Sequence, residues 1–189
     1  MDQIKQIIKE SIDVKERLLN DPILVDKIRI SVDLMTATFK NHGSLWFCGN
    51  GGSAADAQHL AAEFTGRFYK DRDPLSAEAL HVNTSYLTAV GNDYSFDLVY
   101  SRLLKGKARK GDLLVAISTS GNSANIIECI KTAKTIGVPV IGFTGETGGK
   151  MADLCDILIN IPSKDTPRIQ ESHILVGHIM CYLVEENLF

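Results

Sequence analysis

The chain has 189 residues, 44% of them hydrophobic, and its 20 basic and 23 acidic side chains leave a formal net charge of −3. This length suits one compact domain, and the acidic balance with scattered lysines and arginines argues against a nucleic-acid partner. No segment reaches the roughly 18 apolar residues of a membrane span, and no signal-peptide pattern opens the chain, so no membrane association is expected. We expect a soluble, cytoplasmic protein with reduced thiols, because the cysteines are far apart and form no CxxC pair: Cys48, Cys129, Cys155 and Cys181.

Two amphipathic helices come first, over 2–19 and 23–41, and Pro22 marks the start of the second. Short apolar runs and helical patterns then alternate. They predict strands at 45–49, 79–82, 112–118, 138–145 and 156–162, and helices at 53–66, 95–107, 121–136, 147–153 and 167–187. Apolar strands that alternate with helices indicate a parallel sheet covered on both faces. We therefore predict an α/β three-layer sandwich with a five-stranded, doubly wound parallel sheet.

In such a fold, ligands bind at the carboxyl ends of the strands, near the point where the strand order reverses. Four predicted loops lie there, with the sequences GNGGS, STSGNS, TGETGG and PSKDTP. STSGNS carries hydroxyls at Ser118, Thr119, Ser120 and Ser123, just before a helix. Hydroxyls together with free N–H groups at a helix N-terminus suit a phosphate. The alternative is plain N-capping, for which one serine is enough.

The GNGGS turn predicts a second cradle for an anion. Gly51 and Gly52, after Asn50, let a ligand approach the main chain, and Ser53 is expected to cap the following helix. The turn lacks the third glycine of the dinucleotide fingerprint, and no Walker lysine follows it. The phosphate is therefore expected to belong to a small metabolite.

The helix over 53–66 carries a polar stripe among its alanines. Asp56, Glu63 and Arg67 lie within about 20° of one line, and His59 lies about 60° to the side. One interpretation is a solvent-exposed face with Glu63 and Arg67 as an ion pair. The other is that His59 and Glu63 hold one metal ion from a single face of the helix.

The last helix, over 167–187, presents Gln170 and His178 about 80° apart around its axis. Gly177 beside His178 lets another element come close. A lone histidine on an apolar helix is more often a core residue. Two helices that each present a histidine and an oxygen ligand nevertheless make a tetrahedral divalent ion such as zinc a competitive interpretation.

The loop AVGNDYSFD places Asn92 and Asp93 after the second predicted strand. A polar pair at this edge of the sheet could bind sugar hydroxyls. A turn or a helix cap explains the same residues equally well.

Four segments, GNGGSAADAQHLAAEF, GNDYSFDLVYSR, STSGNSANI and RIQESHILVGHIMCYLVE, occur in this order along the chain. With them the sequence resembles the phosphoheptose isomerases, which belong to the sugar-isomerase (SIS) domain family. The resemblance implies a single flavodoxin-like SIS domain over 1–189, with a helical extension over about 1–41. It also implies a homotetramer with active sites between subunits and one zinc ion per subunit. The implied metal ligands are His59, Glu63, Gln170 and His178, and the implied substrate contacts are Asn50, Gly51, Gly52, Ser53, Glu63, Asn92, Asp93, Ser118, Thr119, Ser120, Ser123 and Gln170.

The implied reaction converts D-sedoheptulose 7-phosphate into D-glycero-D-manno-heptose 7-phosphate, the first step of activated heptose biosynthesis for bacterial cell-surface polysaccharide. An enediol route needs a base at carbon and an acid at oxygen, and the resemblance implies Glu63 as base and His178 as acid. A carboxylate bound to zinc is a weaker base, so the two roles of Glu63 compete. The chain departs from the family at Asn83, where an aspartate is usual.

Two other functions are compatible with the same fold. One is a non-catalytic SIS protein that binds the replication initiator DnaA, but such proteins generally lack the helix carboxylate that Glu63 provides. The other is an isomerase of a different sugar phosphate, such as a hexulose or amino-sugar phosphate. The combination of Gln170 and His178 with His59 and Glu63 favours the heptose branch.

Overall fold

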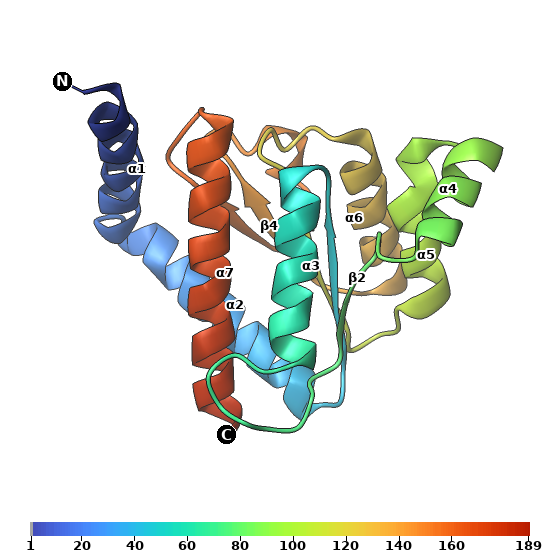
Figure 1. The fold of residues 1–189 in the computed structure, drawn as a ribbon. Helices are drawn as coiled ribbons and strands as arrows, with labels where there is room; N and C mark the ends of the chain where they lie inside the picture. The colour runs from blue at the N-terminus through green and yellow to red at the C-terminus, as the bar shows by residue number, and fades with distance from the viewer. Residues whose placement is uncertain (1) are drawn as a thin grey trace.

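The computed structural model describes residues 2–189, which form one sheet flanked by helices (Figure 1). The α-helices are α1 (Gln3–Leu19), α2 (Pro22–Lys40), α3 (Gly52–Thr65), α4 (Thr84–Asp93), α5 (Val99–Lys107), α6 (Ala124–Ile136) and α7 (Thr166–Leu188). The strands are β1 (Leu45–Gly49), β2 (Ala77–Ala79), β3 (Leu113–Ile117), β4 (Val140–Thr144) and β5 (Ile157–Asn160), and the short 3-10 turns are η1 (Phe96–Leu98) and η2 (Gly149–Met151). Across residues 2–189, no helix is long and apolar enough to cross a bilayer.

The five strands of the described chain are all parallel and lie in the order β2-β1-β3-β4-β5. β1 pairs with β2 on one side and with β3 on the other, so the strand order reverses at β1. β1, β3 and β4 are buried along their whole length, which explains their continuous apolar sequences. The predicted α/β three-layer sandwich with a flavodoxin-like parallel sheet is confirmed.

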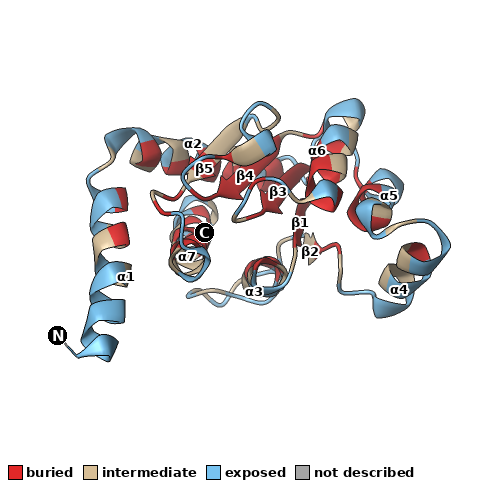
Figure 2. Ribbon diagram, turned by 90° about the horizontal axis from the view of Figure 1, so that it is seen from above, coloured by how far each residue is buried: buried red, intermediate tan, exposed pale blue. Residues whose placement is uncertain are grey.

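Side chains from alternate strand positions fill two cores, one on each face of the sheet. One core holds Phe47, Val115 and Phe143 and is covered by α2, α3 and α7. The other holds Leu114 and Ala116 and is covered by α5 and α6. Figure 2 shows α3 and α7 on one face and α5 and α6 on the opposite face. α1 lies outside these layers and packs along α7 and α2.

The segment Thr84–Asp93 forms α4, where the sequence predicts no helix. Its residues have weak helix propensity, because several are β-branched and one is Gly91. Packing of Val90 into the core overrides that propensity. Asn83 caps the helix, since its Oδ1 accepts a 3.1 Å hydrogen bond from the Tyr86 N–H. Aspartate and asparagine are equally good caps at such a position, so this local role does not depend on which of the two is present.

Several predicted boundaries are wrong. The helix predicted over 95–107 divides into η1 and α5, and the helix predicted over 147–153 reduces to the 3-10 turn η2. α6 begins at Ala124 and not at Gly121, because Gly121 adopts a φ of +65°, which lies outside the helical region. β2 lies earlier in the chain than predicted, at Ala77–Ala79.

Candidate active site

The site begins where α3 and α7 lie side by side (Figure 1). The two helices run in the same direction: Gly52, which opens α3, faces Gln170 near the start of α7, and Leu60 faces Gly177 further along. The side chain of Leu60 fills the space that a Cβ atom on Gly177 would need. The prediction that Gly177 lets another element come close is confirmed.

Three side chains of ligand type converge beside this contact. His59 Nε2 lies 3.0 Å from Glu63 Oε1 and 3.5 Å from His178 Nε2. One ligand atom from each of the three residues lies within 4.8 Å of the others. Two imidazole nitrogens and a carboxylate oxygen are donors that zinc prefers, so this arrangement fits a divalent metal. Among the described residues Glu63 pairs with His59, whereas Arg67 is exposed and lies beyond the end of α3, so the alternative of a Glu63–Arg67 ion pair is wrong.

The surroundings of His178 favour its neutral form. Burial lowers the pKa of His178 and the neighbouring His59 lowers it further, while Glu63 acts in the opposite direction. The ring centroids of Phe68 and His178 are 5.5 Å apart, so the Phe68 ring restricts the orientation of the imidazole. A neutral imidazole can bind a metal through one ring nitrogen and carries an N–H on the other, so His178 fits the metal-ligand and the acid roles that the resemblance implies.

Asp56 lies on α3 three residues before His59 and belongs to the polar stripe seen in the sequence. Burial raises the pKa of Asp56 to about 6, and the nearby His59 opposes this shift. Its Oδ2 atom is buried and has no hydrogen-bond partner among the residues the structure describes. Asp56 therefore adds to the site a carboxyl group that is readily protonated below neutral pH.

Gln170 lies apart from the three converging ligands. Its side-chain amide lies against the backbone of Gly52, at the start of α3. Gln170 and His178 are eight residues apart on one helix, which corresponds to a rise of about 12 Å. The structure thus brings three of the four predicted ligands together, and the metal-ligand role of Gln170 stays a prediction.

The loop between β3 and α6 carries the four hydroxyl residues that the sequence predicts as a phosphate cradle. Ser118 is buried, and its Oγ lies 3.2 Å from the Oγ of Ser123. Ser123 is the N-cap residue of α6, yet its side chain makes no capping hydrogen bond. Plain capping therefore does not explain Ser123. Its hydroxyl bonds the Ser118 hydroxyl instead, at the N-terminus of α6, where an anion is favoured.

A cavity of about 280 Å³ opens beside this loop. Three of the loops predicted to form the ligand edge, after β3, β4 and β5, contribute to its wall: Thr119, Ser120, Asn122, Gly145, Glu146, Thr147, Ser163, Lys164, Thr166 and Ile169. Their convergence follows from the parallel sheet, whose strands all end at this edge. The hydroxyl and amide groups of the wall and Lys164 suit a small anionic group, whereas the Glu146 carboxylate, 3.9 Å from Lys164 Nζ, opposes one.

The GNGGS turn follows β1 at the same edge. Gly51 adopts a φ of +55°, which glycine tolerates and other residues rarely adopt. Asn50 and Asn125 exchange two side-chain hydrogen bonds of 2.9 Å, and the Tyr100 hydroxyl donates to the Gly49 carbonyl. The expectation that Ser53 caps α3 is wrong: Ser53 is buried inside the helix, and the N-cap is Gly51.

The remaining predicted substrate contacts lie elsewhere in the chain. Asn92 and Asp93 end α4, where the Asn92 Nδ2 donates a 2.9 Å hydrogen bond to Asp93 Oδ1 and both residues are exposed. Both views place α3 between α7 and α4, with α4 at the end of the molecule opposite α1 (Figures 1 and 2). Within one chain, therefore, these two residues do not join the cluster between α3 and α7.

Sequence patterns did not identify two residues, Arg72 and Glu185, that connect the main chain of Glu63 to α7. Glu185 near the end of α7 and Arg72 in the loop after α3 form a buried ion pair, with Arg72 Nε 3.0 Å from Glu185 Oε1. Arg72 also donates to the main-chain carbonyl of Glu63. Neither residue belongs to a recognisable motif. The one available signal is a glutamate placed on the apolar face of a helix, where a charged residue requires a partner.

The five-stranded parallel sheet with its order reversed at β1 defines a doubly wound α/β domain. The family model described as SIS domain matches residues 8–145 of it. A phosphoheptose isomerase from Mycobacterium tuberculosis is 53% identical over 185 residues, which cover 98% of this chain and 94% of that protein. Another from Aneurinibacillus thermoaerophilus is 51% identical and covers 100% of this chain and 95% of that protein. The chain therefore belongs to the SIS domain family and, within it, to the phosphoheptose isomerases.

Solved structures agree with this assignment. The phosphoheptose isomerase of Neisseria gonorrhoeae is 46% identical, with a TM-score of 0.92 and 98% of both chains covered. That of Francisella tularensis is 31% identical, also with a TM-score of 0.92, over 98% of this chain and 97% of that one. The sugar isomerase domain of an RpiR transcription factor from Sphaerobacter thermophilus, at 17% identity and a TM-score of 0.66, shares the fold alone. The fold by itself therefore does not decide the function.

Proposed function

We propose that this protein is an aldose–ketose isomerase that converts D-sedoheptulose 7-phosphate into D-glycero-D-manno-heptose 7-phosphate, the first step of activated heptose biosynthesis. The observation that carries the proposal is the contact of Glu63 and His178 with His59 in a chain that matches phosphoheptose isomerases over nearly its whole length. A carboxylate and a neutral imidazole at one place supply the base and the acid that the reaction requires.

The chemistry follows from these two groups. The Glu63 carboxylate takes a proton from C1 of the ketose while His178 donates a proton to the carbonyl oxygen at C2, which gives an enediol. Glu63 then returns a proton to C2, and His178 takes the proton of the C1 hydroxyl, so that an aldehyde forms at C1. No proton is gained or lost overall. His59 holds Glu63 Oε1 at 3.0 Å and so fixes the base in place.

We propose one zinc ion per subunit, held by His59, Glu63 and His178, with Gln170 as the fourth ligand once its side chain turns from Gly52 toward the ion. The convergence of three of these residues supports the proposal, and a bound zinc would polarise the substrate carbonyl. The lowered pKa of His178 keeps its imidazole in the form that binds a metal.

The phosphate of the substrate is proposed to bind at the N-terminus of α6, in contact with the hydroxyls of Ser118, Thr119, Ser120 and Ser123. The placement of Ser123 at the N-cap of α6 without a capping hydrogen bond supports this position, as does the cavity that Thr119 and Ser120 of the same loop line. The GNGGS turn, with Asn50, Gly51, Gly52 and Ser53, is proposed to hold the sugar, and Gln170 reaches the same turn from α7.

We further propose a homotetramer in which Asn92 and Asp93 of one subunit reach the site of another, since α4 lies far from α7 within one chain. Exposed apolar side chains on α1 support association, because Ile4, Ile8 and Ile12 repeat every four residues along one face and are 66%, 54% and 46% exposed. The free cysteines support a place in the reducing cytoplasm.

The test is a comparison of substrates. The purified protein is incubated with sedoheptulose 7-phosphate, fructose 6-phosphate and ribulose 5-phosphate, and each aldose product is measured. We expect turnover of the heptulose phosphate at a kcat/KM at least about 100-fold above the others, because hydroxyl contacts to the longer sugar are lost with the shorter ones. Preference for a shorter sugar would assign the site to another substrate, and turnover of none would reject the isomerase.

A further inference from the structure

Glu185 is a buried carboxylate that the reaction itself does not use. It lies on α7, seven residues after His178, and is only 1% exposed. Its two oxygens accept hydrogen bonds from three successive backbone N–H groups, those of Phe68 at 3.2 Å, Tyr69 at 2.8 Å and Lys70 at 2.8 Å. A carboxylate held by several backbone donors and a guanidinium is well satisfied. Burial raises the pKa of Glu185, but these donors outweigh it and leave the pKa below its ordinary value.

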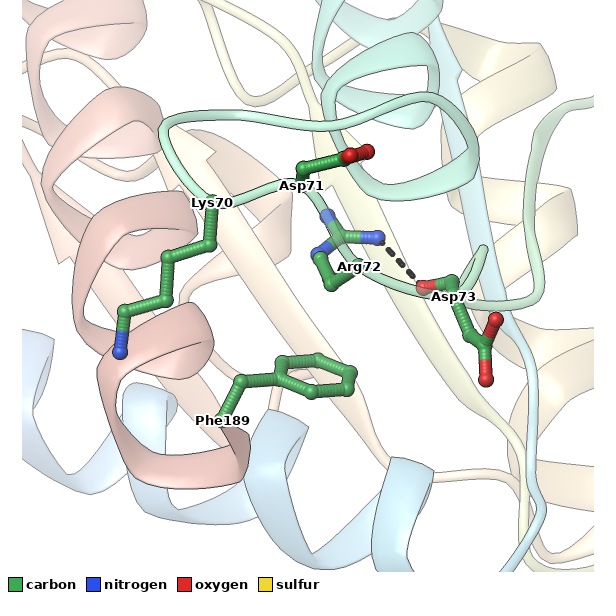
Figure 3. Close-up of a pocket in the computed structure, with 5 residues that line it drawn as sticks. All are labelled: Lys70, Asp71, Arg72, Asp73 and Phe189. Carbon is green, nitrogen blue, oxygen red and sulfur yellow. Dashed lines mark hydrogen bonds between the residues drawn. The ribbon is translucent and has the colours of Figure 1, made fainter.

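Arg72 completes this arrangement from the loop that follows α3. Its side chain is 2% exposed, and its Nε donates to Glu185. Its Nη2 donates at 2.9 Å to the carbonyl of Glu63, and its Nη1 donates at 2.8 Å to that of Phe64. Nη1 also donates at 3.0 Å to the carbonyl of Asp73, as Figure 3 shows. Arg72 thus ties the last turn of α3 to the loop.

The ion pair is connected to both proposed catalytic residues. Through Arg72 it holds the main chain of Glu63. Through the N–H of Phe68 it holds the aromatic ring that lies 5.5 Å from the His178 ring. The adjacent Tyr69 ring lies 5.7 Å from that of Tyr182 on α7, which fastens the loop to the same helix.

We propose that Arg72 and Glu185 are positioning residues for the isomerisation. Together they fix the spacing between Glu63 on α3 and His178 on α7. This inference rests on the proposed function. A buried ion pair contributes little net stability compared with an apolar pair of similar size, so stability alone does not account for it. Its hydrogen bonds are directional, however, and a displacement of about 1 Å between catalytic groups lowers turnover strongly.

The chain offers a matched control. Lys70 and Glu186 form a second ion pair between the same loop and the same helix, with 3.0 Å between Lys70 Nζ and Glu186 Oε1. Its side chains are 34% and 45% exposed, and exposed pairs contribute little. Glu186→Gln therefore removes one loop-to-helix ion pair and leaves the buried one intact.

The test compares Glu185→Gln, Arg72→Lys and Glu186→Gln with the wild type. Arg72→Lys keeps the charge but loses the fork that reaches Glu63 and Phe64, and Phe68→Leu adds a variant without a buried polar change. Each protein is checked for folding by circular dichroism. Its kcat and KM for sedoheptulose 7-phosphate are measured, and the metal-free form is titrated with zinc alone.

We expect kcat to fall roughly tenfold or more in Glu185→Gln and Arg72→Lys with KM changed less than about twofold, because the substrate contacts remain and the spacing of the catalytic groups is lost. Zinc affinity falls in the same variants, Phe68→Leu shows a smaller loss of kcat, and Glu186→Gln matches the wild type. Folded Arg72→Lys and Phe68→Leu proteins with wild-type kcat and zinc affinity would overturn the inference. A wild type without turnover would refute the proposed reaction instead, and the zinc titration would still decide whether the pair positions the two residues.

Discussion

Gly177 of α7 lies so close to Leu60 of α3 that a Cβ atom at position 177 would be 2.5 Å from Leu60 Cδ2 and 3.1 Å from its Cγ. Leu60 is 2% exposed, so its side chain has little room to move away. His178 and His59 flank this contact, with 3.5 Å between their Nε2 atoms. The close approach of the two helices thus sets the distance between the residues that form the site.

Gly177→Ala should therefore push α3 and α7 apart. We expect a loss of about 1–3 kcal/mol in the free energy of unfolding, typical of overpacking, together with weaker zinc binding. Gly91→Ala is the control, because a Cβ on Gly91 of α4 would have no atom within 4 Å, and alanine there should stabilise the helix by up to about 1 kcal/mol. Urea unfolding of both variants measures these changes, and a Gly177→Ala protein as stable as the wild type would contradict the packing described.

Removal of a histidine from the converging cluster should abolish tight metal binding. His59→Gln and His178→Gln are expected to weaken zinc affinity by more than about 100-fold, since even residues outside the ligand shell cost 10- to 100-fold. Titration of the metal-free proteins with zinc in competition with a chromogenic chelator measures this. His81→Gln, which lies outside the cluster, serves as control. Equal zinc affinity in all three variants would place the metal elsewhere.

Ser123→Ala should affect binding more than folding. Its hydroxyl makes no capping hydrogen bond to α6 and bonds only the Ser118 hydroxyl at 3.2 Å, so the stability cost is expected to stay at about 1 kcal/mol or less, while KM for the sugar phosphate rises several-fold. Asp21→Ala is the reverse control: Asp21 caps α2 with two hydrogen bonds of 3.0 Å, and its loss should cost about 1 kcal/mol without a change in KM. An unchanged KM in Ser123→Ala would remove this serine from the phosphate cradle.

His173 should make stability depend on pH. Burial lowers the pKa of His173 from 6.5 to about 4, opposed by the 3.1 Å hydrogen bond between its Nε2 and the Thr144 carbonyl. The unfolded chain takes up this proton at a higher pH than the folded chain does. The free energy of unfolding therefore has its full value above about pH 6.5 and falls as the pH drops toward 4, by on the order of 3 kcal/mol from this group.

Urea unfolding at several pH values between about 4.5 and 7 measures that slope. His173→Gln should flatten it, whereas replacement of the exposed His42 by Gln should leave it unchanged. If the slope survives intact in His173→Gln, another group carries the pH dependence.

The elements of the sheet could be predicted because β1, β3 and β4 are buried on both faces and so appear as continuous apolar runs. Because these strands could be predicted, the loops that follow them at the carboxyl edge of the sheet could be predicted too. α4 could not be predicted, since its helix depends on the packing of Val90 and not on local propensity.

Side-chain placement was predicted less completely. The i,i+4 spacing of His59 and Glu63 identifies them as a pair, and the histidine of α7 joins them as expected. Gln170 shares a helix with His178 but faces Gly52, which the angle around the helix axis does not reveal. The Arg72–Glu185 pair joins residues 113 positions apart, and no local pattern encodes such a contact.

The measurement that tests the central claim most directly is turnover of sedoheptulose 7-phosphate by the wild type and by Glu63→Gln, each with and without a chelator. We expect the wild type to form D-glycero-D-manno-heptose 7-phosphate and the chelator to slow it. Glu63→Gln should lower kcat by at least about 1,000-fold, because the amide can neither take the C1 proton nor bind zinc as a carboxylate does. A folded Glu63→Gln protein with wild-type turnover, or a folded wild type that forms no product with any added divalent metal, would contradict the account.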